Sequence, residues 1–154
     1  MVILTAMVCF EIIKATLFGY YVPDIKDYNS SIGQYPEAFL RDVSIEGTGS
    51  IGNGEYLVSD GNSETGYSVV EEVKGRYGPV LPYRTAAANP NFLSSGDAIY
   101  VSALKTFLVI TDTGGGLKYG EIDVFVGNGV RAYQSWLDRD IQSSNILKIC
   151  RKER

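Results

Sequence analysis

Glycine is the feature that most constrains the fold of this chain. Seventeen glycines are distributed over 154 residues, and they separate short runs rich in valine, isoleucine, tyrosine and threonine. Such runs favour β-strands, and glycine supplies the positive φ angles that tight turns need. The sequence therefore predicts a mainly β fold in which short strands are joined by turns.

The length and composition fit one folded domain with a limited set of functions. The chain has 45% apolar residues, a net charge of -4 and no histidine. The apolar fraction is sufficient for a core, and the acidic balance disfavours nucleic-acid partners. Without histidine, Ser-His and Cys-His nucleophiles and most zinc sites are excluded. We expect no metal and no cofactor, and we expect any proton transfer to use Asp, Glu, Tyr or Lys.

The two ends of the chain carry an apolar segment and the two cysteines. Residues 2–10 are apolar, but the run is too short to span a bilayer and lacks the flanks of a signal peptide. We therefore expect no integral membrane span. Residues 1–14 are interpreted as an N-terminal apolar segment, either a packed strand or an unusual signal-like segment, and residues 15–154 as the main domain. Cys9 and Cys150 either pair across adjoining ends or are two separate buried thiols.

Local patterns place the expected elements. Apolar and β-branched runs predict strands, and a proline start and an apolar stripe at helical spacing predict two short helices. A region dense in Gly-Asn-Gly and Asp-Gly turns predicts two-stranded structure. The strands are expected at 12–22, 67–73, 98–110, 122–126 and 145–149, and the segment 98–110 contains continuous apolar runs at 98–101 and 107–110. The helices are expected at 36–43 and 131–140, the turn-dense pair within 45–66, and an irregular link at 82–96.

Two aspartates flank a glycine-rich link between two expected strands. Asp112 ends one strand, and Asp123 lies between Ile122 and Val124 in the next. Because side chains alternate along a strand, Asp123 faces outward toward a groove if its two neighbours face the core. Glycan cleavage needs a carboxyl group that is protonated near neutral pH. From the spacing alone, a turn-capping Asp112 and a surface Asp123 are the simpler interpretation.

Two other interpretations of the same segment fail. The triple glycine lacks the G-x-x-x-x-G-K-[ST] pattern of a phosphate-binding loop and the helix that should follow it. A single Asp-Thr-Gly motif in a chain of this length does not form a two-lobed aspartic protease, so only a homodimer with one motif per chain remains of that interpretation.

The same segment resembles a known family. Residues 112–127, DTGGGLKYGEIDVFVG, resemble the closing signature of the 3D-domain family, D-T-G-G-x-I-K-G-x-x-I-D-[LV]-[FY], with the same spacing between its second and third aspartates. Residues 83–90, followed by Gly96 and 99–101, resemble the family's Y-R-S-x-A-V-D-P segment and the strand after it. Residues 20–23 and 39–49 resemble the opening parts of longer members, so the resemblance covers most of residues 15–149.

The resemblance implies both a fold and a reaction. It implies a six-stranded double-psi β-barrel with one or two short helices, related to the catalytic barrel of membrane-bound lytic transglycosylase A. It also implies a lytic transglycosylase that cleaves the MurNAc-GlcNAc bond of peptidoglycan and leaves 1,6-anhydro-muramic ends. The family's catalytic third aspartate falls on Asp123, and its second falls on Asp112. These two are the expected catalytic residues.

One position departs from the family pattern. The first family aspartate falls on Asn89, which cannot carry charge. Loss of this charge is expected to lower the pKa of Asp123 and to weaken it as an acid. Residues 92–97 also differ from the family segment. The expected substrate contacts are Asn89, Tyr83, Arg84 and Lys118.

The resemblance also implies partners and a location, and an alternative function stays open. The expected partner is the peptidoglycan glycan strand, with self-association through edge strands as a further option. The implied location is extracellular, associated with the cell wall, or inside a virus particle. The alternative function is a non-catalytic glycan-binding or structural module of the cell wall, a filament or a virion. If the site is shared, Asp112 and Asp123 should lie at adjacent strand ends with Asn89 within a side chain's length.

Overall fold

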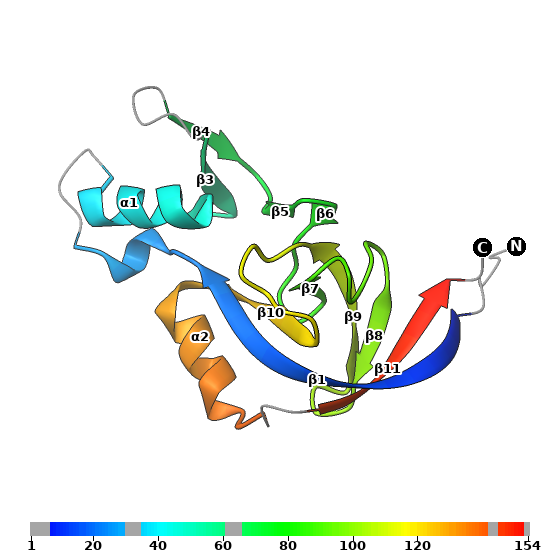
Figure 1. Ribbon diagram of the computed structural model, residues 1–154. Helices are drawn as coiled ribbons and strands as arrows, with labels where there is room; N and C mark the ends of the chain where they lie inside the picture. Colours follow the sequence, from blue (N-terminus) through cyan, green and yellow to red (C-terminus); the bar gives the residue numbers. More distant parts are fainter. Residues whose placement is uncertain (1–6, 30–34, 61–65, 142–144, 153–154) are drawn as a thin grey trace, which may run out of the picture.

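Six strands form a curled, barrel-like sheet, and a smaller unit lies beside it (Figure 1). The computed structural model describes residues 7–29, 35–60, 66–141 and 145–152. The strands pair in the order β1-β10-β7-β9-β8-β11, and β11 pairs in turn with β1. The predicted mainly β class is confirmed, and the structure also has two short α-helices, as predicted. The six strands of this barrel-like sheet are β1 (Met7–Val22), β7 (Thr85–Ala88), β8 (Ala98–Val101), β9 (Thr106–Asp112), β10 (Glu121–Asn128) and β11 (Asn145–Lys152).

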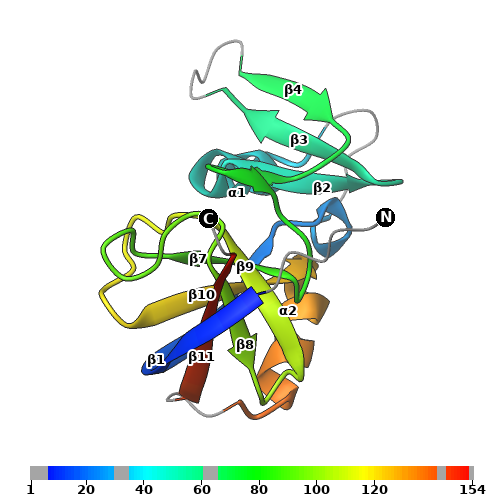
Figure 2. The ribbon, with the colours of Figure 1, turned by 90° about the vertical axis from the view of Figure 1, so that its right-hand side faces the viewer.

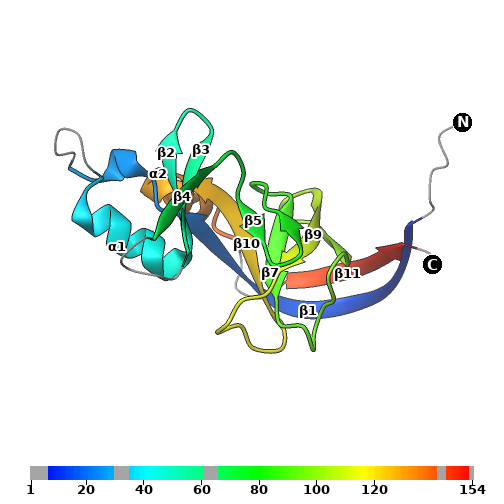
Figure 3. The same cartoon turned by 90° about the horizontal axis from the view of Figure 1, so that it is seen from above.

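The first strand is long enough to pair with two different neighbours. Residues 7–15 of β1 run antiparallel to β11, and residues 16–22 run parallel to β10. Figure 3 shows β1 and β11 side by side along this seam. The division expected after residue 14 therefore falls inside one continuous strand. In the same pairing, the backbone of Cys9 lies opposite that of Cys150, so the two cysteine positions are neighbours in the sheet.

The irregular link expected at 82–96 was a wrong prediction, because it contains β7. This strand pairs with β10 on one side and β9 on the other, and its four residues are all buried. Its sequence, Thr-Ala-Ala-Ala, lacks the bulky β-branched residues that mark strands in a sequence. Small side chains suit a strand enclosed between two others, so burial rather than propensity determines this element.

The core of the barrel-like sheet lies on its inner face and extends to α2 (Gly129–Asp138). Of the residues whose side chains the structure describes, thirteen buried ones form this cluster, and Trp136 of α2 belongs to it. Gly19 of β1 permits the contact, since a Cβ atom there would lie 2.6 Å from the Trp136 ring. The fully buried members include Ala86, Ala88, Ile99, Val101, Leu108, Ile122 and Val124.

A second helix and a three-stranded sheet form a smaller region that we call the α1 unit. It consists of α1 (Glu37–Glu46), β2 (Thr48–Gly52), β3 (Glu55–Ser59) and β4 (Tyr67–Val70). Figure 2 shows this sheet above the barrel-like sheet, with α1 alongside it. The two-stranded turn region expected within 45–66 is confirmed as β2 and β3.

Short elements connect the two regions. The 3-10 helix η1 (Ile25–Asp27) follows β1, and the hairpin of β5 (Lys74–Gly75) and β6 (Gly78–Pro79) follows β4. Among the described residues, the apolar core cluster of the α1 unit has three buried members, Phe39, Val43 and Leu57. Neither α1 nor α2 combines the length and apolar character needed to cross a bilayer, and the same holds for η1.

Candidate active site

The strand register places Asp112 and Asp123 on either side of one residue. Ala87 of β7 pairs with Asp123 of β10 and with Asp112 of β9. Residues that pair directly across strands point to the same face of a sheet. The two aspartates were expected at adjacent strand ends, but β7 separates them, so their Cα atoms lie about 10 Å apart.

The alternation expected around Asp123 is confirmed. Ile122 and Val124 are fully buried in the core, whereas Asp123 is half-buried on the outer face of β10. Within the described part of the chain, its buried Oδ1 atom has no hydrogen-bond partner. A carboxylate in such a place is poorly solvated, which favours its protonated form.

The pKa of Asp123 is raised to about 6. The largest cause is burial, followed by the negative charges of Glu46 and Glu121. Glu46 comes from the α1 unit and Glu121 from the same strand as Asp123. The raised pKa therefore does not require a charge at position 89, where the family pattern has an aspartate and this chain has Asn89.

An apolar cluster includes Phe125, which lies on the same face of β10 as Asp123. Phe125 lies two positions further along β10 and packs with Val22, Val73 and Val80. Tyr20 of β1 covers Phe125, with ring centroids 5.2 Å apart. Burial and the charges of both aspartates raise the pKa of the Tyr20 hydroxyl above its ordinary value.

Tyr20 therefore lies near both aspartates, and sequence reasoning had not placed it in the site. Its position in residues 20–23, which resemble the family's opening segment, was the available signal. Glu46 was missed in the same way, since it falls within the resembling residues 39–49.

Asp112 holds backbone groups in place. Its Oδ1 accepts hydrogen bonds from the backbone N–H of Arg76 at 2.9 Å and of Thr113 at 2.8 Å. Gly75 packs on the same side chain, since a Cβ atom there would lie 2.7 Å from the Asp112 Cβ. Asp112 thus holds the first residue of the link that follows β9, and it also fixes the β5–β6 hairpin against β9.

Asn89 ties the end of β7 to the glycine-rich link. Its Nδ2 donates to the Leu117 carbonyl at 3.0 Å, and its Oδ1 accepts from the Asn91 backbone N–H at 2.9 Å. Because Asn89 lies two positions beyond Ala87, it is a diagonal neighbour of Asp123, with Cα atoms about 7 Å apart. Both ends of its amide are engaged by the backbone.

The other three expected contacts lie in different surroundings. Tyr83 packs against Trp136 of α2, with the Arg139 guanidinium 4.1 Å from its ring centroid. Its hydroxyl is buried without a partner among the described residues. Arg84 is exposed at the start of β7, and Lys118 is exposed in the glycine-rich link. The structure thus brings Asp112, Asp123 and Asn89 together and directs Tyr83 toward α2.

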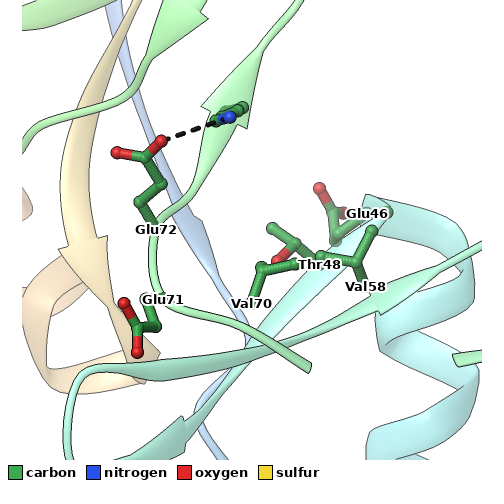
Figure 4. Close-up of a pocket in the computed structure, with 8 residues that line it drawn as sticks. Glu46, Thr48, Val58, Val70, Glu71 and Glu72 are labelled. Atoms are coloured by element: carbon green, nitrogen blue, oxygen red, sulfur yellow. Dashed lines mark ion pairs between the residues drawn. The ribbon is translucent and has the colours of Figure 1, made fainter. Parts of the chain in front are cut away.

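A cavity of about 870 Å³ lies at the junction between the α1 unit and the hairpin (Figure 4). Its charged lining consists of Glu46, Glu71, Glu72 and Lys74, and Lys74 forms an ion pair with Glu72 at 3.3 Å. Neither site aspartate lines it. The cavity lies near Asp112, because Lys74, which lines it, precedes Gly75, the glycine that packs on Asp112.

Solved lytic transglycosylases have a similar structure. MltA of Escherichia coli with bound chitohexaose gives a TM-score of 0.59 at 13% identity, covering 92% of this chain and 72% of that one. A second MltA structure from Escherichia coli gives 0.55 at 12% identity, covering 90% and 72%. LtgG of Burkholderia pseudomallei gives 0.51 at 12%, covering 88% and 72%. This chain therefore shares the fold of these solved structures.

Comparisons of sequence find no relative that corresponds to these similar structures. No family model matches the chain, and no curated protein matches it. The resemblance to the 3D-domain family therefore stays a resemblance. At this level of identity the similar structures establish the fold alone, and the chemistry must come from the residues of the site.

Proposed function

We propose that this chain is a peptidoglycan lytic transglycosylase-like domain that cleaves the MurNAc-GlcNAc bond and leaves 1,6-anhydro-muramic ends. The observation that carries the proposal is the half-buried Asp123, whose pKa is raised to about 6 by burial and by neighbouring carboxylates. A carboxyl group with such a pKa can give and take a proton near neutral pH. The lytic transglycosylase fold supports this assignment.

In the proposed reaction, Asp123 acts first as an acid and then as a base. Its carboxyl proton passes to the glycosidic oxygen as the bond from that oxygen to the muramic C1 breaks, and positive charge develops on the sugar ring. The resulting carboxylate then takes the proton of the C6 hydroxyl, whose oxygen bonds to C1 and closes the anhydro ring. The carboxyl group ends protonated, as it began, and no water is consumed because the C6 hydroxyl is the nucleophile.

The remaining site residues have supporting roles in this proposal. Asp112 holds the hairpin beside the site through its two backbone hydrogen bonds. Asn89 holds the glycine-rich link, and exposed Arg84 and Lys118 are available to contact the glycan. Tyr83 supports the barrel-like sheet from its α2 side.

The proposal extends to the finer fold and to location. The parallel pairs β1/β10 and β7/β9 flank the antiparallel pair β10/β7, an arrangement that supports a six-stranded double-psi barrel. The substrate lies outside the cytoplasmic membrane, so the protein would act extracellularly, at the cell wall, or after delivery in a virus particle. Self-association would use β2 or β4, the outer strands of the three-stranded sheet.

Asn89 favours a second function, a glycan-binding or structural module without activity. Its amide is committed to the backbone of Leu117 and Asn91. A site that has replaced an ionisable group by a structural one can keep its fold and its ligand without catalysis.

Incubation with purified sacculi distinguishes the two functions. We expect wild type to release anhydro-muropeptides, detected by mass spectrometry, and Asp123→Asn to lose at least 100-fold of this activity, the lower end of about 10² to 10⁴ for a general acid-base group. Asp138→Asn is the matched control, because Asp138 is an exposed aspartate on α2. If wild type sediments with sacculi but releases nothing, the binding function is correct. If it does neither, a purely structural role is the better account.

A further inference from the structure

Phe18 points to the same face of the barrel-like sheet as Asp123. Its two neighbours on β1 face the core, since Leu17 belongs to the large core cluster and Gly19 lies against Trp136 of that cluster. Because side chains alternate along a strand, Phe18 faces outward. In the parallel pairing of β1 with β10, Phe18 lies opposite Asp123 (Figure 1). Paired strands are about 4.8 Å apart, so the two side chains are direct neighbours.

The ring of Phe18 is open to solvent. It is 43% exposed. Among the residues whose side chains the structure describes, it has no aromatic partner and belongs to no buried cluster. The next outward residue of β1, Tyr20, differs, because its ring packs on Phe125 with centroids 5.2 Å apart. Packing therefore accounts for the ring of Tyr20 but not for that of Phe18.

The two strand neighbours of Asp123 differ in exposure. On the β7 side, Ala87 pairs with Asp123 and points to the same face, but it is only 5% exposed. The hairpin that Asp112 holds lies on this side. On the β1 side, the neighbour is the exposed ring of Phe18. A ligand that reaches Asp123 therefore finds accessible surface on the β1 side, and that surface is aromatic.

The groups around Phe18 favour a sugar over an apolar partner. The outward pair that precedes Phe18 and Asp123 along the two strands is Thr16 and Glu121. One ring among hydroxyl and carboxyl groups differs from the broad apolar patch of a protein interface. A sugar has the complementary pattern, with C–H groups on its faces and hydroxyl groups at its rim. Small-molecule sites commonly combine an aromatic wall with a few polar groups in this way.

We propose that Phe18 is a substrate-binding residue, on which a sugar ring next to the cleaved bond stacks. The inference deepens the proposed function and rests on it. The axial C–H groups of a pyranose ring carry a slight positive charge, which matches the negative face of an aromatic ring. A sugar held on Phe18 brings its glycosidic oxygen beside the Asp123 carboxyl group, one strand away.

Binding is measured without cleavage in the full chain carrying Asp123→Asn, by NMR titration with the neutral oligosaccharide chitohexaose. Adding Phe18→Ala should weaken binding about tenfold, which is about 1.4 kcal/mol. Phe18→Leu, which keeps apolar bulk without the ring, should also weaken it, and Phe18→Tyr should keep most of the affinity. Phe107→Ala, at an equally exposed phenylalanine of β9, is the matched control. An affinity that Phe18→Ala leaves unchanged overturns the proposal, as does a parent protein that binds neither chitohexaose nor sacculi.

A second pair of measurements separates stacking from a merely structural role, in which Phe18 shields Asp123 from water. The carboxyl ¹³C signal of Asp123, titrated by NMR, should keep its midpoint in Phe18→Leu, because leucine preserves the apolar bulk. In cleavage of sacculi, Phe18→Leu should raise the apparent KM more than it lowers kcat. A displaced midpoint with an unchanged KM overturns the stacking role.

The two proposals fail in different ways. If wild type releases no anhydro-muropeptides but Phe18→Ala weakens chitohexaose binding, the proposed function falls and the stacking role stands. If wild type cleaves, and Phe18→Ala both binds and cleaves like wild type, only the stacking role falls. Analytical ultracentrifugation tests the other occupant, a second copy of the chain. Self-association that Phe18→Ala removes, with glycan binding unchanged, makes the ring a contact between copies and overturns the proposal.

Discussion

The barrel-like sheet and the α1 unit each pack a ten-residue helix onto a sheet across a glycine, but the cores behind the two contacts differ. Trp136 of α2 lies over Gly19 and belongs to a cluster of thirteen buried residues. Val43 and Phe39 of α1 lie over Gly49 and form, with Leu57, a cluster of three. A core of three residues is too small to be stable alone.

This difference bears on how the site works. The proposed acid, Asp123, is on the region with the large core, where neighbouring strands hold its backbone on both sides. Glu46 and much of the cavity lining are on the region with the small core. Regions of low local stability commonly supply the moving parts of binding sites. We therefore expect the α1 unit to adjust to a glycan while the acid stays fixed.

Truncation of one leucine in each core gives the largest expected effect. Leu108→Ala should cost about 2–5 kcal/mol of global stability, because Leu108 is fully buried in the large cluster. Leu57→Ala should instead increase amide hydrogen exchange in residues 37–59 at little cost to the main urea transition. Both are measured by urea denaturation and hydrogen exchange. If both substitutions lower one shared transition equally, the regions form a single cooperative unit and the comparison fails.

Replacement of the two contact glycines by alanine gives the next largest effect. A Cβ atom at Gly49 would lie 2.5 Å from Val43, and one at Gly19 would lie 2.6 Å from Trp136. Each alanine substitution overpacks its contact and should cost about 1–3 kcal/mol. Gly49→Ala should release α1, seen as faster exchange of its amides, whereas Gly19→Ala should lower the global urea midpoint. Gly115→Ala, with no atom within 4 Å of the added methyl group, is the control.

Asp123 should make stability depend on pH in a direction opposite to that of an ion-paired aspartate. Its pKa is raised from 3.8 to about 6 on folding, so the folded chain binds more protons than the unfolded chain between these values. Its contribution is therefore greatest below pH 4 and is lost as pH rises to 6. Partial exposure reduces the effect to about 1–2 kcal/mol.

Asp123→Asn removes this dependence. Urea denaturation should find the variant more stable than wild type above pH 6, with the difference disappearing below pH 4. Asp138→Asn, on the exposed face of α2, should show no such pH dependence. A wild-type stability that rises between pH 4 and 6 relative to Asp123→Asn would show that the carboxylate is stabilised by the fold, contrary to its assignment as an acid.

The success of sequence reasoning depended on the kind of signal. Alternation around Asp123 predicted its outward direction because Ile122 and Val124 are large and apolar. β7 was missed because alanines carry no strand signal, although their small size is what fits them between β9 and β10.

The site was predicted in part for a related reason. Asp112 and Asp123 lie within one motif, so their proximity could be read from a single segment. The ring of Tyr20 and the charge of Glu46 come from β1 and α1, which are distant in sequence from Asp123. Only the folded arrangement shows that they act near Asp123. The expected glycan contact of Tyr83 stays a prediction, and the structure adds that its ring packs against Trp136.

Asn89→Asp tests whether a charge on the barrel side of the site acts like the one from the α1 unit. The Asn89 Nδ2 donates to the Leu117 carbonyl, and a carboxylate cannot, so the substitution should cost about 1 kcal/mol at pH 7. The cost should shrink at low pH, where the protonated group can donate again. Urea denaturation across pH measures it, with Asn91→Asp as control, because exposed Asn91 contributes a backbone N–H to this contact.

The same substitution adds a negative charge at a diagonal neighbour of Asp123. It should raise the pKa of Asp123 and move the alkaline limb of the pH profile of sacculus cleavage to higher pH. Glu46→Gln should move this limb to lower pH, because the Glu46 charge raises the pKa of Asp123. The double variant Asn89→Asp with Glu46→Gln should return the limb toward its wild-type position, since one charge is gained and one is lost. If Asn89→Asp leaves the limb in place while Glu46→Gln moves it, Asp123 responds to the α1 unit alone. The pH dependence of the acid would then be set by the less stable of the two regions.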